Sequence, residues 1–219
     1  IGVKNKPMIQ VVVENLKPET DHRFIFIVLK EHLDKYAMKN LLEFIAPGCI
    51  IIPLENITEG AACTVLLAKE FIDGDDELII ANADQFVDLN FNDFISASRE
   101  HKADGNIMTF PSTHPKWSFA RVDDSGVVTE VAEKKPISNK ATVGIYYYSH
   151  GKYFCDAVET MIAKDVRFNN EFYVCPAYNE MILANKTVRT YDISQDVMYG
   201  LGTPEDYEAF LKSDVIEKI

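Results

Sequence analysis

ELIIANADQFVDLNF, at residues 77–91, is the stretch of this sequence that decides how the rest of the chain is interpreted. Its residues 78–81 form a short apolar run of the kind found in strands that are buried on both faces. Residues 82–84 (NAD) end that strand, and a helix is expected to begin near Asn90. In open α/β sheets, ligands bind beyond the carboxyl ends of the strands, so Asp84 is expected where a ligand would lie.

Asp84 can be interpreted in two ways. A carboxylate at a strand end is a suitable ligand for a hard divalent cation that is shared with substrate phosphates. Alternatively, Asp84 caps the helix that starts near Asn90 or turns the chain, because Asp is common at both kinds of position. This stretch alone leaves both interpretations open.

Before residue 101, the predicted strands and helices alternate. The strands are 22–29, 49–54 and 78–81, and the helices are 31–44, 58–72 and 90–101. Residues 7–16 form either a helix that begins at Pro7 or a strand rich in β-branched residues. The alternation indicates a parallel sheet that is covered by helices.

After residue 101, the predicted strands are shorter. They are 105–110, 118–122, 126–131 and 143–148, with a turn at 123–126 that suits a hairpin. Helices are expected again at 151–163, 178–184 and 204–211. We therefore predict an α/β fold in one domain: a Rossmann-like, mostly parallel mixed sheet with flanking helices and a small appended antiparallel sheet.

The composition is ordinary for a globular protein, with 47% hydrophobic and 26% charged residues in a chain of 219. The formal net charge is −12 and no basic stripe is present, which disfavours DNA and RNA as partners. The sequence shows neither an apolar run long enough for a membrane span nor a signal peptide, so we expect no membrane partner and a cytoplasmic location. Cysteines without CxxC spacing indicate reduced thiols: Cys49, Cys63, Cys155 and Cys175.

The loop NITEGAA, at residues 56–62, enters a predicted helix. Its small residues Gly60 and Ala61 would let a flat ring or a phosphate approach the backbone, and the first N–H groups of the helix would be free to bind it. Alternatively, Thr58 is an ordinary N-cap and Gly60 serves only close packing.

Two further loops carry side chains suited to sugar-phosphate chemistry. Trp117, in HPKWS at 114–118, either stacks on a sugar or base or closes an edge of the core. Lys134, in EVAEKKPIS at 130–138, either neutralises a substrate phosphate or belongs to a solvated surface.

The segment MYGLGTPED, at residues 198–206, is a helix entrance with Thr203 at the N-cap and Pro204 at the first helical position. Capping does not explain the Gly-Leu-Gly that precedes it. We expect these glycines to allow a close approach of the backbone to another group.

The order of six motifs along the chain resembles that of the sugar-phosphate nucleotidyltransferases, and the resemblance covers nearly the whole chain. The motifs are KPMI (6–9), TEGAA (58–62), NADQ (82–85), EKKP (133–136), VGIYYY (143–148) and LGTPED (201–206). The resemblance implies a glycosyltransferase-A-like domain that joins a nucleoside triphosphate to a sugar 1-phosphate with loss of pyrophosphate. It also implies bacterial polysaccharide precursor synthesis as the setting.

The resemblance also implies roles for individual residues. Asp84 would be the Mg²⁺ ligand and, with Lys134, a catalytic residue, and Lys134 would hold the sugar phosphate. The candidate nucleotide-binding residues are Thr58, Glu59, Gly60, Ala61, Asn82 and Ala83. The candidate sugar-phosphate-binding residues are Trp117, Glu133, Gly144, Glu171 and Asn179.

Two departures from the family pattern are visible. The first strand and the glycine-rich loop that grips the triphosphate are not in this sequence, so we expect a single domain, 1–219, that lacks them. Many members carry a second metal-binding aspartate where this sequence has Gly200, so the second ligand is either Asp192 or Asp196, or is missing.

Two other functions compete with this interpretation. A glycosyltransferase that uses a nucleotide sugar usually has two acids separated by one residue, whereas three residues separate Asp84 from Asp88. A catalytically inactive regulatory domain that binds a nucleotide sugar would fit the absent loop and Gly200. The oligomeric state is open, a homo-oligomer included.

Overall fold

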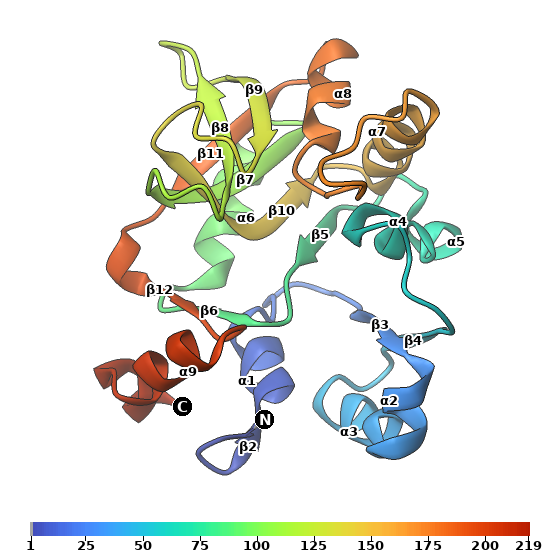
Figure 1. Cartoon of the computed structure of the whole chain (residues 1–219), viewed down its shortest axis with the longest axis vertical. Helices are drawn as coiled ribbons and strands as arrows, with labels where there is room; N and C mark the ends of the chain where they lie inside the picture. The colour runs from blue at the N-terminus through green and yellow to red at the C-terminus, as the bar shows by residue number, and fades with distance from the viewer. Residues whose placement is uncertain (1) are drawn as a thin grey trace.

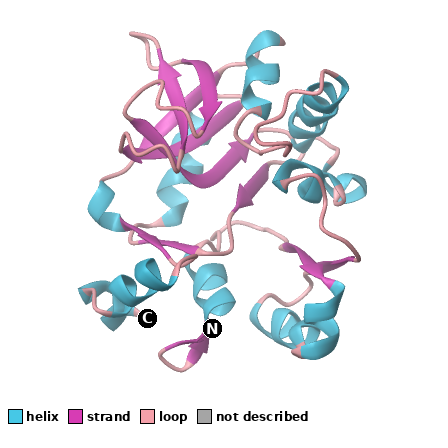
Figure 2. Cartoon of the chain, viewed as in Figure 1, coloured by secondary structure: helices cyan, strands magenta, loops and turns pink. Residues whose placement is uncertain are grey.

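A six-stranded mixed sheet forms the centre of the computed structural model, which describes residues 2–219 (Figures 1 and 2). The strands lie in the order β11-β7-β10-β8-β9, and β5 also pairs with β10. Their bounds are β5 Leu78–Ala81, β7 Gly105–Pro111, β8 Ser118–Val122, β9 Val128–Glu133, β10 Lys140–Tyr148 and β11 Val188–Asp192. Within the described residues, β11 is parallel to β7 and the other pairings of this sheet are antiparallel.

The predicted α/β class, with a mixed sheet and flanking helices, is confirmed, but the pairing of β5 differs from the expectation. The alternation of elements predicts a parallel partner, whereas β5 is antiparallel to β10, with Ala81 opposite Ile145 and Leu78 opposite Tyr148. Its residues are half-buried or exposed rather than buried on both faces. An apolar run indicates a strand but does not specify the direction of its partner, which is set by distant residues.

A separate parallel pair, β3 and β4, lies with α2 and α3 at the lower right of Figure 1. The bounds are β3 Ile25–Leu29, α2 Lys30–Lys35, α3 Met38–Ile45 and β4 Ile50–Leu54. The helix predicted at 31–44 is therefore wrong as a single element. Ala37 has a left-handed backbone, with φ 49°, and this conformation divides α2 from α3.

The helix interpretation of residues 7–16 is confirmed by α1. The bounds of the N-terminal elements are β1 Gly2–Val3, β2 Lys6–Pro7 and α1 Met8–Asn15. The helix predicted at 58–72 is divided into two, α4 Ala61–Leu66 and α5 Lys69–Ile72. The later helices are near their predicted places: α6 Phe91–Glu100, α7 Gly151–Ala163, α8 Ala177–Leu183 and α9 Pro204–Leu211. Two short strands pair, β6 Gln85–Val87 with β12 Met198–Gly200, and the 3-10 turns are η1 Gln195–Val197 and η2 Asp214–Lys218.

The side chains of β10 alternate between two apolar clusters, one on each face of the strand. Each cluster contains residues of helices, so helices cover both faces of β10. Tyr146 and Tyr148 point into the cluster that includes residues of α7 and α8, whereas Tyr147 points into the cluster that includes residues of α1, α6 and α9. No helix among residues 2–219 is both long enough and apolar enough to cross a membrane.

Candidate functional site

The sheet divides at Gly144. β10 pairs with β8 at Ala141 and with β5 from Ile145 onward, and its register with β7 shifts between Thr142 and Tyr146. Gly144 lies between these pairings with φ +93°. This division opens the sheet where the end of β5 meets the middle of β10.

Two features favour glycine at position 144: a φ of +93°, which residues with side chains rarely adopt, and the side chains of Asn82 and Gln85, which lie against it. The backbone N–H of Asn82 donates a hydrogen bond to the Gly144 carbonyl at 3.0 Å. A Cβ atom at Gly144 would stand 2.3 Å from Asn82 Nδ2 and 2.9 Å from Gln85 Oε1. The structure thus brings together Asn82, a predicted nucleotide-binding residue, and Gly144, a predicted sugar-binding residue.

Asp84 lies in the exposed loop between β5 and β6 and does not cap a helix. The N-cap of α6 is Asn90, whose side-chain oxygen accepts a hydrogen bond from the Asn92 N–H at 3.1 Å. The Asp84 carbonyl accepts from the Leu201 N–H at 2.7 Å. A Cβ atom at Gly202 would stand 2.4 Å from Asp84 Oδ2, so the close approach expected from the Gly-Leu-Gly is confirmed.

Glu133 ends β9 and Lys134 follows it. Only 9% of Glu133 is exposed, and its carboxylate accepts a hydrogen bond from the Ser118 hydroxyl. Burial raises the pKa of Glu133 more than this hydrogen bond lowers it. Lys134 has a left-handed backbone, with φ 51°, and its N–H donates to the Trp117 carbonyl at 3.0 Å.

The Trp117 side chain lies at the edge of the core. Its ring meets Phe110 edge-to-face, with centroids 5.3 Å apart, and the Lys116 ammonium lies 4.6 Å from the ring centroid. The indole is half-buried. Trp117 therefore closes a core edge, as one of the two interpretations expects, while its carbonyl holds Lys134.

Residues 58–62 pair with the backbone of Phe172. The Phe172 N–H donates to the Glu59 carbonyl at 2.8 Å, and the Ala62 N–H donates to the Phe172 carbonyl at 3.0 Å. Gly60 has φ +126°, and a Cβ atom there would stand 2.5 Å from the Phe172 carbonyl oxygen. Gly60 is therefore required for close packing.

Thr58 is not an N-cap, contrary to that alternative. Its hydroxyl donates to the Gly60 carbonyl at 2.9 Å and pairs with the Thr64 hydroxyl at 2.6 Å. The helix begins at Ala61, three residues after the predicted start, because Gly60 has a conformation outside the helical region. The Glu59 carboxylate forms an ion pair with Arg167.

Glu171 directly precedes Phe172, whereas Asn179 contacts β9. Glu171 closes a two-residue turn in which Asn169 and Asn170 both have positive φ, 48° and 64°. The Asn179 amide exchanges two hydrogen bonds, each 2.9 Å long, with the backbone of Val131 in β9. The amide of Asn179 thereby anchors β9 two residues before Glu133.

Comparisons with known proteins identify the family of this chain and match its fold. The family model described as nucleotidyl transferase matches residues 1–209. This chain belongs to the nucleotidyl transferase family. The resemblance of its motifs to nucleotidyltransferases is therefore confirmed at the level of the family.

Solved structures of related folds cover nearly all of this nucleotidyl transferase. A nucleoside-diphosphate-sugar pyrophosphorylase from Vibrio cholerae RC9 has a TM-score of 0.82 at 24% identity, over 97% of this chain and 90% of its own. A putative glucose-1-phosphate thymidylyltransferase from Bacillus anthracis has a TM-score of 0.70 at 20% identity, over 95% and 82%. The inositol-1-phosphate CTP transferase from T. maritima has a TM-score of 0.75 at 13% identity, over 99% and 83%. At these identities the likeness establishes the fold.

Sequence reasoning missed several residues of this nucleotidyl transferase that lie beside the predicted ones. Gln85 is 3% exposed, touches Gly144, and its Nε2 has no hydrogen-bond partner among residues 2–219. Tyr173 accepts a hydrogen bond from Lys134, and Arg167 pairs with Glu59. The position of Gln85 directly after Asp84 was the one feature of the sequence that could have identified it. The other two contacts join residues far apart in the sequence, so no local pattern indicates them.

The exposed Asp84 carboxylate suits Mg²⁺, which commonly takes one or two carboxylates and completes its shell with substrate phosphates and water. Among residues 2–219, no three His, Cys, Asp or Glu side chains converge on a shared point. Asp192 is engaged elsewhere by Thr109 and Lys140, and Asp196 by Ser194. Burial raises the pKa of Asp192. The hydrogen bonds from Lys140 and Thr109, together with the charge of Lys140, lower this pKa by more, so the net shift is downward.

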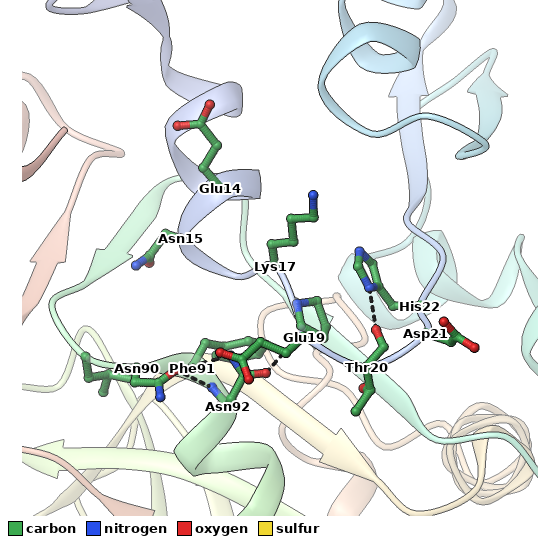
Figure 3. Close-up of a pocket in the computed structure, with 12 residues that line it drawn as sticks. Glu14, Asn15, Lys17, Glu19, Thr20, Asp21, His22, Asn90, Phe91 and Asn92 are labelled. Atoms are coloured by element: carbon green, nitrogen blue, oxygen red, sulfur yellow. Dashed lines mark hydrogen bonds between the residues drawn. The ribbon is translucent and has the colours of Figure 1, made fainter.

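A polar pocket of about 750 Å³ lies apart from these residues, between the end of α1, the loop 17–22 and the start of α6 (Figure 3). The His22 ring nitrogen bonds the Thr20 carbonyl at 2.7 Å, and Asn92 Oδ1 accepts from the Glu19 N–H at 2.8 Å. None of the predicted site residues lines this pocket. The candidate site is instead the region around Gly144 and the end of β5, where Asn82, Gly144, Asp84 and Gly202 come together.

Proposed function

We propose that this protein joins a nucleoside triphosphate to a sugar 1-phosphate, releasing pyrophosphate and forming a nucleotide sugar. The observation that carries the proposal is the division of the sheet at Gly144, where the end of β5 and Gly202 meet around Asp84. A loop at the end of a strand, open to solvent and carrying a carboxylate, is a typical binding place for phosphates and their cation in α/β folds.

We assign the nucleotide to one side of this site. Residues 58–61, Asn82 and Ala83 would contact the base through their backbone groups and side chains, although the open side of Gly60 is already filled by the Phe172 backbone. The rigid pairing of this loop with Phe172 supports the assignment, since preorganised contacts lose little conformational freedom on binding.

We assign the sugar phosphate to the other side. The Lys134 ammonium would neutralise the phosphate, and Glu133 would accept hydrogen bonds from sugar hydroxyls. Gly144 and Glu171 would border the sugar, with Trp117 and Asn179 holding the backbone on which Lys134 and Glu133 are placed.

In the proposed reaction, a phosphate oxygen of the sugar 1-phosphate attacks the α-phosphorus of the nucleotide, in line with the departing pyrophosphate. One P–O bond forms and one breaks, and no covalent intermediate with the protein is needed. Catalysis then consists of positioning and charge neutralisation, in which Lys134 balances charge on the sugar phosphate. Asp84 would hold Mg²⁺, which when bound supplies positive charge beside the phosphate oxygens.

The deciding experiment measures pyrophosphate release by the purified protein with Mg²⁺, across the nucleoside triphosphates and a panel of sugar 1-phosphates. Release that requires both substrates would support the proposal and identify the pair. Transfer of sugar from a nucleotide sugar would instead indicate a glycosyltransferase, and binding of a nucleotide sugar without turnover would indicate a regulatory domain. The proposed product belongs to polysaccharide precursor synthesis in the cytoplasm.

A further inference from the structure

The Lys134 side chain is held by a residue 39 positions further along the chain. Its ammonium Nζ donates a hydrogen bond to the Tyr173 hydroxyl at 3.0 Å. The same nitrogen lies 4.9 Å from the centroid of the Tyr173 ring and 5.7 Å from that of Phe168. An otherwise flexible lysine is thus fixed by one hydrogen bond and two aromatic rings.

This contact leaves Lys134 able to bind a phosphate. An ammonium group has three N–H donors, and the Tyr173 hydroxyl accepts one of them. Two donors remain for an anion that enters the site. A neutral hydroxyl also adds no negative charge beside the ammonium, whereas a carboxylate in the same place would compete with the phosphate.

Tyr173 is itself held rigidly by the hairpin at 168–173. Phe168 and Glu171 exchange two backbone hydrogen bonds of 3.0 Å across the Asn169-Asn170 turn. Phe172 is 1% exposed in the core, and its backbone pairs with residues 59–62. The backbone that leads into Tyr173 is therefore anchored, and the Tyr173 ring meets Phe168 edge-to-face, with centroids 6.2 Å apart.

The backbone of Lys134 needs such support, because a left-handed conformation is unfavourable for a residue with a side chain. The hydrogen bond from its N–H to Trp117 fixes the main chain, and Tyr173 fixes the far end of the side chain. A residue with a strained backbone, held both at its main chain and at the end of its side chain, is characteristic of a site where orientation matters for function.

We infer that Tyr173 is a positioning residue, whose hydroxyl holds the Lys134 ammonium in the orientation that receives the sugar phosphate. The inference rests on the proposed function for the identity of the ligand. The contact between Tyr173 and Lys134 rests on the structure alone. The contact and the identity of the ligand can therefore be tested separately.

The test replaces Tyr173 by Phe, which removes the hydroxyl and keeps the ring. We expect KM for the sugar 1-phosphate to rise about tenfold, as for loss of a hydrogen bond to a charged group, with KM for the nucleotide changed less than twofold. In a Lys134→Met background, the same substitution should change KM for the sugar 1-phosphate no further. Tyr36→Phe, at an exposed tyrosine on the end of α2, is the matched control and should leave both constants unchanged.

A second measurement does not depend on turnover. The rate at which acetic anhydride acetylates Lys134, followed by mass spectrometry against pH, reports the pKa of its amine. The hydrogen bond to Tyr173 is the largest effect on the pKa of Lys134 and raises it, and the charges of Glu133 and Glu171 raise it further. Tyr173→Phe removes the first effect and keeps both carboxylates, so it should move the labelling curve to lower pH. An unchanged curve would overturn the inference whatever the substrate proves to be.

The two measurements separate the possible failures. Suppose that the labelling curve shifts but KM changes equally for both substrates, or changes for neither substrate. Either outcome would overturn the role of Tyr173 in sugar-phosphate binding. A wild-type protein that is inactive with every substrate pair would contradict the proposed function, and the inference would fail with it, although the labelling curve would still report the contact. A shifted curve together with a selective rise in KM for the sugar 1-phosphate supports both.

Discussion

Asp84 and Gly202 lie so close together that a Cβ atom at position 202 would stand 2.4 Å from Asp84 Oδ2. The two residues are 118 positions apart, and the hydrogen bond from the Leu201 N–H to the Asp84 carbonyl joins their loops. The missing side chain of Gly202 therefore sets where the Asp84 carboxylate can lie.

Gly202→Ala should displace the Asp84 carboxylate and lower kcat at least tenfold, with a melting temperature close to that of the wild type. The matched control is Gly200→Ala, where the added Cβ would meet the Asp206 side chain, with Oδ2 at 3.2 Å and the other atoms at 3.4 Å or more. Pyrophosphate-release assays on both variants, alongside thermal melts, check this. Equal kcat values for the two variants would contradict it.

Asp84→Asn should abolish turnover while the protein stays folded, because it removes the negative charge and keeps the size of the side chain. The control is Asp88→Asn, at a carboxylate that pairs with Lys218 on the surface. Mg²⁺ titrations of activity and of intrinsic fluorescence should show that the Asp84 variant alone loses its response to the metal. Near-normal turnover in a folded Asp84→Asn protein would end the proposed role of this residue.

Lys134→Ala should weaken binding of the sugar 1-phosphate far more than binding of the nucleotide, because its charge faces one substrate only. Its neighbour Lys135 is exposed, so Lys135→Ala is the control and should change neither. Isothermal titration calorimetry with each substrate separately measures both affinities. Equal losses for the two substrates would mean that another residue binds the sugar phosphate.

Gly60→Ala should destabilise the fold more than Gly48→Ala, although both glycines have positive φ. A Cβ atom at Gly48 meets nothing within 4 Å, so only backbone strain of about 1–2 kcal/mol is expected there. At Gly60 the Cβ also meets the backbone of Phe172, and a total of about 3 kcal/mol or more is expected. Urea denaturation of both variants measures the difference in the free energy of unfolding.

Glu133 should make the protein less stable as the pH rises. Burial raises the pKa of this carboxyl above its unfolded value, so the folded state binds the proton more tightly. The resulting stabilisation is complete below the unfolded pKa and is lost as the pH rises through the folded pKa. Glu133→Gln should therefore raise the melting temperature at pH 7 relative to wild type, with a smaller difference at pH 4, and a difference independent of pH would refute this.

The sequence by itself determined the local features of this protein. The apolar run before Asn82, the helix start near Asn90 and the close approach at Gly202 could all be predicted, since each depends on a few neighbouring residues and on backbone geometry. The order of the motifs also indicated the family, which the family match over residues 1–209 confirms.

Only the tertiary structure decided how these pieces combine. The antiparallel pairing of β5 with β10, the division of the sheet at Gly144 and the contact of Lys134 with Tyr173 all join distant parts of the chain. The periodicity of a strand records which faces are buried but not which strand lies beside it. Partner and direction follow from the packing of the whole chain, in which β10, buried along nearly its whole length, became the common neighbour of β5, β7 and β8.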